Sequence, residues 1–240
     1  MFSAPSFRVY SGESQYTKKE GFFMKKEAKK YFFWGICFFV LFAVWTVSVT
    51  LVDVRSIGPN GSFVGFATVN GFVHDLVGVN MSLYTVTDWL GLVPLVVAAG
   101  YGVLGFVQLI RRKSIVKVDV SILALGIFYV AVMAAFFIFE EFVVNYRPVL
   151  INGVLEASYP SSTTLLVMCV SPTAVIELWG RIKYKGVCVI TTVVASVFVV
   201  FMVVGRLVSG VHWITDIIGG ALLSTGLVMI YCFALKQFED

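Results

Sequence analysis

The stretch that decides the fold runs VCVITTVVASVFVVFMVVG (187–205), then RLVSGVHWITD (206–216), then IIGGALLSTGLVMIYCFAL (217–235). Each outer segment is close to the roughly 20 apolar residues that a helix needs to cross the hydrocarbon core of a bilayer. The middle segment carries Arg206, His212 and Asp216. Ionisable groups at the edge of a membrane span are costly and are seldom kept without a function. The pattern therefore predicts two membrane helices with a functional site between them.

The spacing of the three ionisable residues indicates the kind of site. His212 and Asp216 stand at positions i and i+4, which face each other on a helix. A carboxylate in that place can fix the tautomer of the imidazole and make it a better nucleophile. Arg206 lies close by in the sequence, and a guanidinium favours an anionic substrate, above all a phosphate. The cluster therefore has the composition of an active site for a phosphate group.

The whole chain has the composition of a polytopic membrane protein. Of its 240 residues, 59% are hydrophobic and only 13% are charged, an excess of apolar surface for which a soluble domain has no use. We expect an all-α fold with six transmembrane helices within a membrane domain over residues 31–240, after a Lys-rich cytoplasmic segment over residues 1–30. The predicted spans are 31–53, 85–110, 118–142, 162–180, 187–206 and 212–235.

The segment between the first two spans predicts a further, shorter helix. Apolar residues recur there at helical spacing between polar ones: Phe63, Phe66, Val69, Val73 and Leu76. Amphipathic helices of this kind lie in the membrane interface rather than across the membrane. His74 belongs to this segment, and we interpret it as a solvated interfacial histidine rather than a catalytic one.

The basic residues predict the orientation of the spans. In a six-span arrangement, all of the 18 lysines and arginines except Arg55, Arg147 and Arg206 fall on one side of the membrane. Loops rich in lysine and arginine stay in the cytoplasm. We therefore expect an integral protein of a bacterial plasma membrane, with both termini in the cytoplasm and the active site on the outer side.

Two more segments on the outer side carry polar residues beside a proline. Asn145-Tyr146-Arg147-Pro148 follows the third span, and Tyr159-Pro160-Ser161-Ser162-Thr163-Thr164 opens the fourth. Ser161 and Ser162 stand where that helix begins, so backbone N–H groups and the helix dipole would favour a bound phosphate. Ser161 would serve equally well as a helix N-cap, and the two roles are compatible.

With these segments the chain resembles the type 2 phosphatidic acid phosphatase family, the membrane branch of a superfamily that includes vanadium haloperoxidases. The family pattern is Lys-x6-Arg-Pro, then Pro-Ser-Gly-His, then Ser-Arg-x5-His-x3-Asp. Arg147-Pro148 match the end of the first part, and Pro160-Ser161 match the start of the second. Arg206, His212 and Asp216 match the third part with its spacing intact. The resemblance covers roughly residues 85–235.

The resemblance implies a six-helix fold and metal-independent dephosphorylation of a lipid through a phosphohistidine. His212 would be the nucleophile and Asp216 its orienting partner. Two arginines and the backbone of two serines would hold the phosphoryl oxygens: Arg147, Arg206, Ser161 and Ser162. We expect no cofactor and no nucleic acid as a partner, but the bilayer and a lipid phosphate or diphosphate. The sequence leaves the lipid and the oligomeric state open.

The chain departs from the family pattern at three positions. Glu140 stands where the first part has lysine, which removes one donor to phosphate, and Gly205 replaces the serine of the third part. Thr163 occupies the place of the histidine that protonates the leaving oxygen in the family. Threonine has no titratable proton near neutral pH. Glu141 follows Glu140, but neighbouring helical residues point about 100° apart, so we expect no metal site.

The missing histidine leaves more than one function open. A general acid is typically worth about 10²–10⁴-fold in rate, or about 3–5 kcal/mol, and a lipid alkoxide needs it most. A lipid diphosphate instead releases a phosphate, a stable anion whose second pKa is about 6. An active enzyme would therefore favour an isoprenyl diphosphate such as undecaprenyl diphosphate. The alternatives are an impaired phosphatase and a non-catalytic binder or transporter of lipid phosphates.

Overall fold

The structure, a computed structural model, describes residues 26–238, and within them there is no β-strand. Six stretches of helix are long and apolar enough to cross a membrane, with α3 and α4 together forming the second. The predicted all-α, six-span fold is therefore confirmed. The helices are α1 (Lys26–Leu51), α2 (Ala67–Val77), α3 (Met81–Leu90), α4 (Leu92–Arg112), α5 (Val120–Glu141), α6 (Ser162–Arg181), α7 (Lys185–Val208) and α8 (Ile214–Phe238), with 3-10 turns at Pro59–Gly61 and Ile115–Lys117.

The observed helices differ from the predicted spans mainly at their ends. α1 begins at Lys26, inside the region that the sequence assigned to the N-terminal segment. Lysines can stay in the first turn of a membrane helix because their long side chains reach the headgroups. The second span starts at Met81, and its two helices meet at Gly91. The rest of the predicted Lys-rich segment, residues 1–25, lies outside the described residues.

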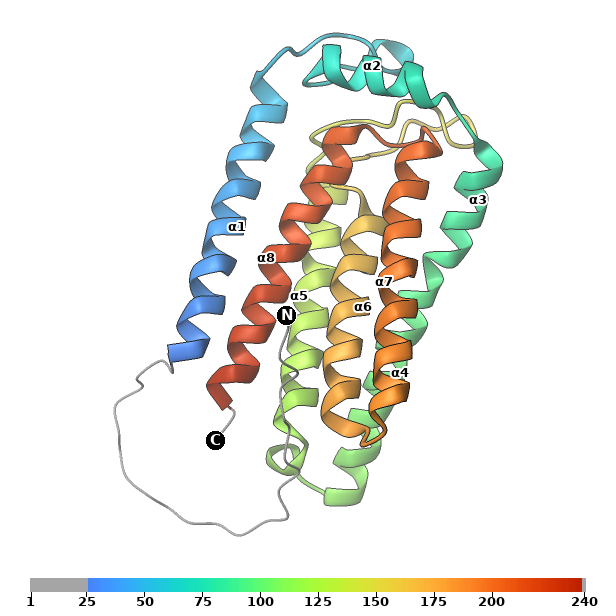
Figure 1. Ribbon diagram of the computed structural model, residues 1–240. Coiled ribbons are helices and arrows are strands. Elements are labelled where there is room, and N and C mark those ends of the chain that lie inside the picture. The colour runs from blue at the N-terminus through green and yellow to red at the C-terminus, as the bar shows by residue number, and fades with distance from the viewer. Residues whose placement is uncertain (1–25, 239–240) are drawn as a thin grey trace.

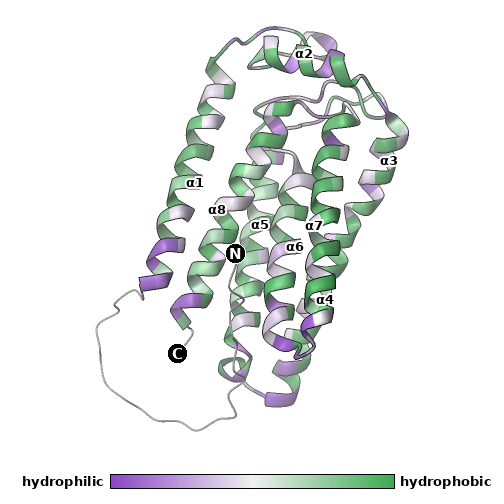
Figure 2. Ribbon diagram, viewed as in Figure 1, coloured by the Kyte–Doolittle hydropathy of each residue, from purple (hydrophilic) through white to green (hydrophobic). Residues whose placement is uncertain are grey.

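The long helices run side by side, and α2 lies across one end of the bundle (Figure 1). The loops between α5 and α6 and between α7 and α8 reach that same end, whereas α8 ends at the opposite one (Figure 1). Hydrophobic residues cover most of the length of the long helices, and hydrophilic ones gather near the ends (Figure 2). The segments that the sequence singled out for phosphate binding are thus brought to one end of the bundle.

The interfacial helix α2 is attached to the bundle by its polar face. Asn70 is fully buried and donates hydrogen bonds to the Gly65 carbonyl (2.7 Å) and to Thr215 Oγ1 (3.0 Å) at the start of α8. The opposite face is apolar and exposed, with Phe72 at 69% and Leu76 at 75%. An apolar face of this kind suits the boundary between lipid and water.

His74 is not the solvated residue that the sequence suggested. Its ring lies 5.4 Å from the ring of Trp213, and its Nε2 atom is buried without a hydrogen-bond partner. His74 is half-buried, because α2 packs against the α7–α8 loop and Trp213 covers one part of its ring. A sequence pattern cannot reveal that contact, because the two segments are far apart along the chain.

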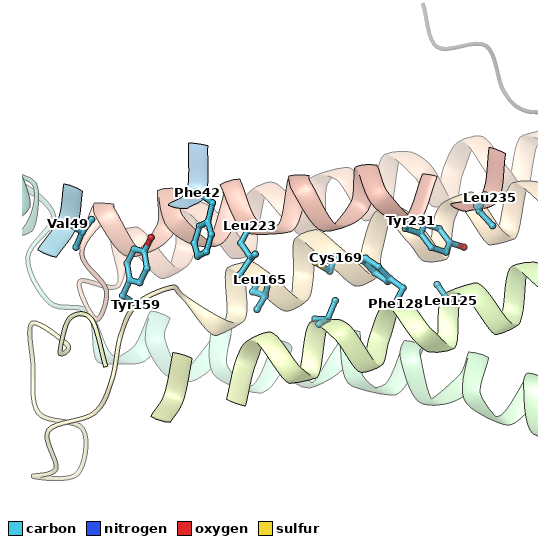
Figure 3. Packing of buried hydrophobic residues seen from close by; sticks show 11 residues of the cluster. Phe42, Val49, Leu125, Phe128, Tyr159, Leu165, Cys169, Leu223, Tyr231 and Leu235 are labelled. Carbon is cyan, nitrogen blue, oxygen red and sulfur yellow. The ribbon is translucent and has the colours of Figure 1, made fainter. Parts of the chain in front are cut away.

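A core of apolar side chains runs along α8 and holds α1, α5 and α6 around it (Figure 3). α1 approaches α8 closely where both carry glycine, and a Cβ on Gly35 would come within 2.7 Å of Ile230 Cδ1. Tyr159, in the loop before α6, stacks on Phe42 of α1 and hydrogen-bonds Thr46 Oγ1 at 2.7 Å. These contacts fix the loop that leads into the α6 N-terminus.

Candidate active site

The loop between α7 and α8 fixes the position of His212. All of its residues, 209–213, are buried. Gly210 has a φ of +67°, a conformation that favours glycine, and a Cβ there would collide with the carbonyl of Gly78. The Ser209 carbonyl accepts the N–H of Asn80 at 3.0 Å. The loop is therefore held against the connection between α2 and α3.

His212 lies between a guanidinium and a carboxylate. Its Nε2 is 3.2 Å from Arg147 Nη1, and its Nδ1 is 3.7 Å from Asp216 Oδ2. An arginine can only donate, so Nε2 must accept with its lone pair. The proton of the neutral ring then lies on Nδ1, facing Asp216. The Nδ1–Oδ2 distance allows attraction but is longer than a hydrogen bond.

The surroundings of His212 keep its ring neutral. Burial lowers the pKa of His212 well below its usual range, and the positive charges of Arg147 and Arg206 lower it further. Both effects disfavour the imidazolium because they remove water and add like charge. At neutral pH the ring therefore keeps the lone pair that a nucleophile needs.

Asp216 is fully buried in the first turn of α8, and both of its oxygens are engaged. Oδ2 accepts the N–H of Trp213 at 2.9 Å, and Oδ1 accepts from Asn145 Nδ2 at 3.4 Å. Asn145 in turn accepts the N–H of Gly65 through its side chain at 3.4 Å and that of Ser158 through its carbonyl at 2.9 Å. Asn145 therefore links the carboxylate to two loops.

Arg147 is positioned by the loop between α5 and α6. Tyr146 and Ala157 form an isolated β-bridge, and the Arg147 N–H donates to the Glu156 carbonyl at 3.0 Å. The side chain of Arg147 is nearly buried, with its Nε 3.0 Å from Glu156 Oε2. This ion pair leaves the Nη1 end of the guanidinium directed at His212.

Arg206 belongs to the last turn of α7 and is held by α3. Its guanidinium lies 4.9 Å from the centre of the Tyr84 ring. Nη1 donates to Thr87 Oγ1 at 3.4 Å and Nη2 to Asp88 Oδ1 at 3.3 Å. The structure thus places Arg206 near enough to act on the pKa of His212, while its hydrogen bonds go to α3.

Gly205, which replaces the serine of the family pattern, lies where α3 packs on α7. A Cβ at this position would be 2.9 Å from Thr87 Cγ2, closer than side chains pack. The glycine therefore has a packing role that the sequence reading, which saw only a lost hydroxyl, did not include.

The two serines at the start of α6 have different positions. Ser161 is the N-cap, and its Oγ accepts the N–H of Thr164 at 3.4 Å. Its own N–H donates to the Asp216 carbonyl at 3.0 Å, so the expectation that this N–H is free for phosphate is not met. Ser162 is half-buried and faces a pocket that also reaches His212. Of the two, Ser162 is placed to meet a ligand.

A small pocket opens in front of His212. Glu140, in the last turn of α5, lines it, whereas Thr163 is buried and does not. The lining of the pocket combines polar side chains with aromatic rings. Its lining residues are Phe136, Phe139, Glu140, Arg147, Ala157, Ser158, Tyr159, Pro160, Ser162, Leu165 and His212.

Among residues 26–238, no three His, Cys, Asp or Glu side chains are grouped as a metal ion would require.

Several supporting residues were not assigned a role from the sequence. Asn145 stands in a quoted segment, two positions before Arg147, but nothing in the sequence pairs it with Asp216. Asp88 lies within the predicted span 85–110, and Tyr84 lies directly before it. A carboxylate within such a span is itself a signal for a buried arginine partner.

The comparisons with known proteins concern the C-terminal sequence and the fold. Residues 133–239 match the family model of the PAP2 superfamily. The fold is similar to the crystal structure of a transmembrane PAP2-type phosphatidylglycerolphosphate phosphatase from Bacillus subtilis, with a TM-score of 0.61 and 16% sequence identity over 86% of this chain and 98% of that one. Among curated protein sequences, none matches. In the sequence of its C-terminal part and in its membrane fold, the chain resembles the PAP2 superfamily.

Proposed function

We propose that this protein is a membrane lipid phosphatase whose site opens at the outer membrane face. The observation that carries the proposal is the environment of His212, a buried neutral imidazole between Arg147 and Asp216. This arrangement suits nucleophilic attack on phosphorus, because one nitrogen keeps its lone pair and the other faces a carboxylate. The resemblance to the PAP2 superfamily supports the same reaction class.

Substrate binding would release the nucleophile. In the free protein, Arg147 Nη1 occupies the lone pair of His212 Nε2. A phosphoryl group entering the pocket would accept this guanidinium on its own oxygens, which leaves Nε2 free to attack. Arg147 would then stabilise the charge on the transferring phosphoryl group, together with Arg206 once phosphate competes with Asp88 for it. Asp216 would stabilise the positive charge that develops on the ring.

A lipid substrate fits the aromatic part of the pocket lining. Phe136 and Phe139 of α5 and Tyr159 line the pocket together with the polar residues. A phosphate headgroup would meet Arg147 and Ser162, while the first carbons of the lipid would contact the rings. The similar Bacillus subtilis protein acts on phosphatidylglycerolphosphate, which is also a lipid phosphate.

Within this class we propose an isoprenyl diphosphate as the preferred substrate. Thr163 supplies no proton for a leaving alkoxide. A phosphate leaving group departs as an anion without one, since its second pKa is about 6. The rate of phosphate release from a polyprenyl diphosphate is therefore expected to exceed that from phosphatidic acid or phosphatidylglycerolphosphate. Equal or faster turnover of either monoester would contradict the preference.

The replacement of histidine by Thr163 also favours two other functions, an impaired phosphatase and a non-catalytic binder or transporter. The variant Thr163→His separates them. We expect it to change diphosphate turnover by less than about tenfold, because the phosphate leaving group gains little from an acid. A gain of about 10²-fold or more on both substrate classes would indicate an impaired enzyme. Lipid binding without phosphate release by either form would indicate a binder.

A further inference from the structure

The reaction proposed above needs a base that the family pattern no longer supplies. Once phosphate is on His212, water must attack it, and water attacks faster when a side chain takes its proton. The histidine that protonates the leaving oxygen in the family is replaced here by Thr163, which cannot exchange a proton near neutral pH. The following inference rests on the proposed function and concerns the group that accepts this proton.

The described residues that line the pocket include few groups able to take a proton. Arg147 is always charged and can only donate. Tyr159 is bound to Thr46, and burial raises the pKa of its hydroxyl. His212 would itself carry the phosphate. The carboxylate that remains in the pocket lining is Glu140.

Two carboxylates outside the pocket lining are already occupied. Asp216 is fully buried on the Nδ1 side of the His212 ring and accepts hydrogen bonds through both oxygens. Glu156 is paired with Arg147 Nε at 3.0 Å. Glu140, in contrast, is exposed to solvent at the pocket, so a proton taken from water can pass on to bulk water.

The position of Glu140 also suits the direction of attack. Phosphoryl transfer places the attacking and leaving oxygens roughly in line on opposite sides of phosphorus. Water must therefore reach phosphohistidine from the side that the leaving group vacated, which is the pocket side of His212. A base on the wall of that pocket faces the incoming water.

From this placement we propose that Glu140 is the general base of the second half-reaction, a catalytic role for the residue that replaces the lysine of the family pattern. Its carboxylate takes a proton from water while the water oxygen bonds to phosphorus. The bond between phosphorus and Nε2 of His212 breaks, its electron pair returns to the ring, and inorganic phosphate leaves. Glu140 then gives the proton to solvent, and no further reactant is needed.

Rapid-mixing kinetics with Glu140→Gln on a polyprenyl diphosphate test the proposal. The first half-reaction does not use the base, so we expect a burst of polyprenyl phosphate with an amplitude close to one per active protein and an unchanged rate. Steady-state release of inorganic phosphate is expected to fall about 10²-fold, and phosphohistidine is expected to accumulate. The matched control is Glu141→Gln, since Glu141 is the exposed neighbour outside the pocket lining.

The possible results separate this proposal from the function on which it rests. If neither the original protein nor Glu140→Gln releases polyprenyl phosphate or inorganic phosphate, the phosphatase itself is refuted. A normal burst followed by undiminished turnover in Glu140→Gln would overturn the role of Glu140 alone, as would a loss of the burst. The conservative variant Glu140→Asp keeps a carboxylate and is expected to turn over faster than Glu140→Gln. This difference would show that the loss in Glu140→Gln comes from the missing carboxylate and not from misfolding. A requirement for Mg²⁺ that is present in the original protein and lost in Glu140→Gln would also overturn the role of Glu140, because Glu140 would then hold a cation.

Discussion

Arg147, which contacts His212, has one role in the free protein and a second, proposed role when substrate is bound. In the free protein the guanidinium donates to Nε2, and its charge adds to burial in lowering the pKa of His212. With substrate bound, the same guanidinium is proposed to turn to the phosphoryl oxygens. The proposed nucleophile is therefore neutral before substrate arrives, and in this proposal the substrate itself uncovers it.

At the scale of the residue, the pH dependence of activity tests whether His212 is neutral in the free protein. Protonation of His212 removes its lone pair, so kcat/KM is expected to fall as pH falls through the pKa of the free protein. Because that pKa is lowered from 6.5, the midpoint of the acidic limb is expected below pH 6.5. As a control, the profile is measured with two substrates whose phosphate pKa values differ. A midpoint set by His212 stays at the same pH for both substrates, whereas a midpoint set by the substrate phosphate shifts between them. A midpoint at or above 6.5 would contradict the account.

At the scale of helices, the site depends on α3 packing closely against α7. α3 supplies the side chains that hold the Arg206 guanidinium: Tyr84, Thr87 and Asp88. Gly205 allows this approach because it has no Cβ to meet Thr87. A residue that looks like a lost family feature is thus a condition for the position of its neighbour Arg206.

Restoring the family serine is therefore expected to harm the protein. Gly205→Ser places a Cβ 2.9 Å from Thr87 Cγ2, and overpacking of this kind costs about 1–3 kcal/mol. The matched control on the same helix is Gly186→Ser, where a Cβ meets nothing within 4 Å. Thermal unfolding in detergent is expected to occur at a lower temperature in Gly205→Ser and at an unchanged or higher one in Gly186→Ser. Equal melting temperatures for the two variants would show that the α3–α7 contact is looser than described.

At the scale of the whole molecule, the sequence was sufficient to predict the features that depend on local composition. The six spans and the short helix before α3 followed from hydropathy, and the alternation of the spans placed the α5–α6 and α7–α8 loops at the same end of the bundle. The spacing of His212 and Asp216 also predicted that these two side chains face each other, as they do in the structure. Contacts between distant segments were not predictable, such as Asn145 with Asp216 or Arg206 with Asp88. No local pattern encodes which loops meet.

The orientation of the whole bundle can be measured by labelling engineered cysteines. Val154→Cys lies in the loop beside the site, and Val116→Cys lies between α4 and α5 at the other end; both positions are well exposed. Since basic loops stay inside, a membrane-impermeant maleimide is expected to label position 154 in intact cells and position 116 only after permeabilisation. The unsubstituted protein controls for its own cysteines. The reverse pattern would place the site in the cytoplasm.

The proposed function as a whole depends on a covalent bond between His212 and phosphate. The most direct measurement is rapid acid-free quenching of the protein during turnover of a polyprenyl diphosphate labelled in its terminal phosphate, followed by identification of the labelled residue. The account predicts label on His212 in the original protein, more of it in Glu140→Gln, and none in His212→Ala. Phosphate release without any label on His212, or lipid binding with neither label nor release, would contradict it.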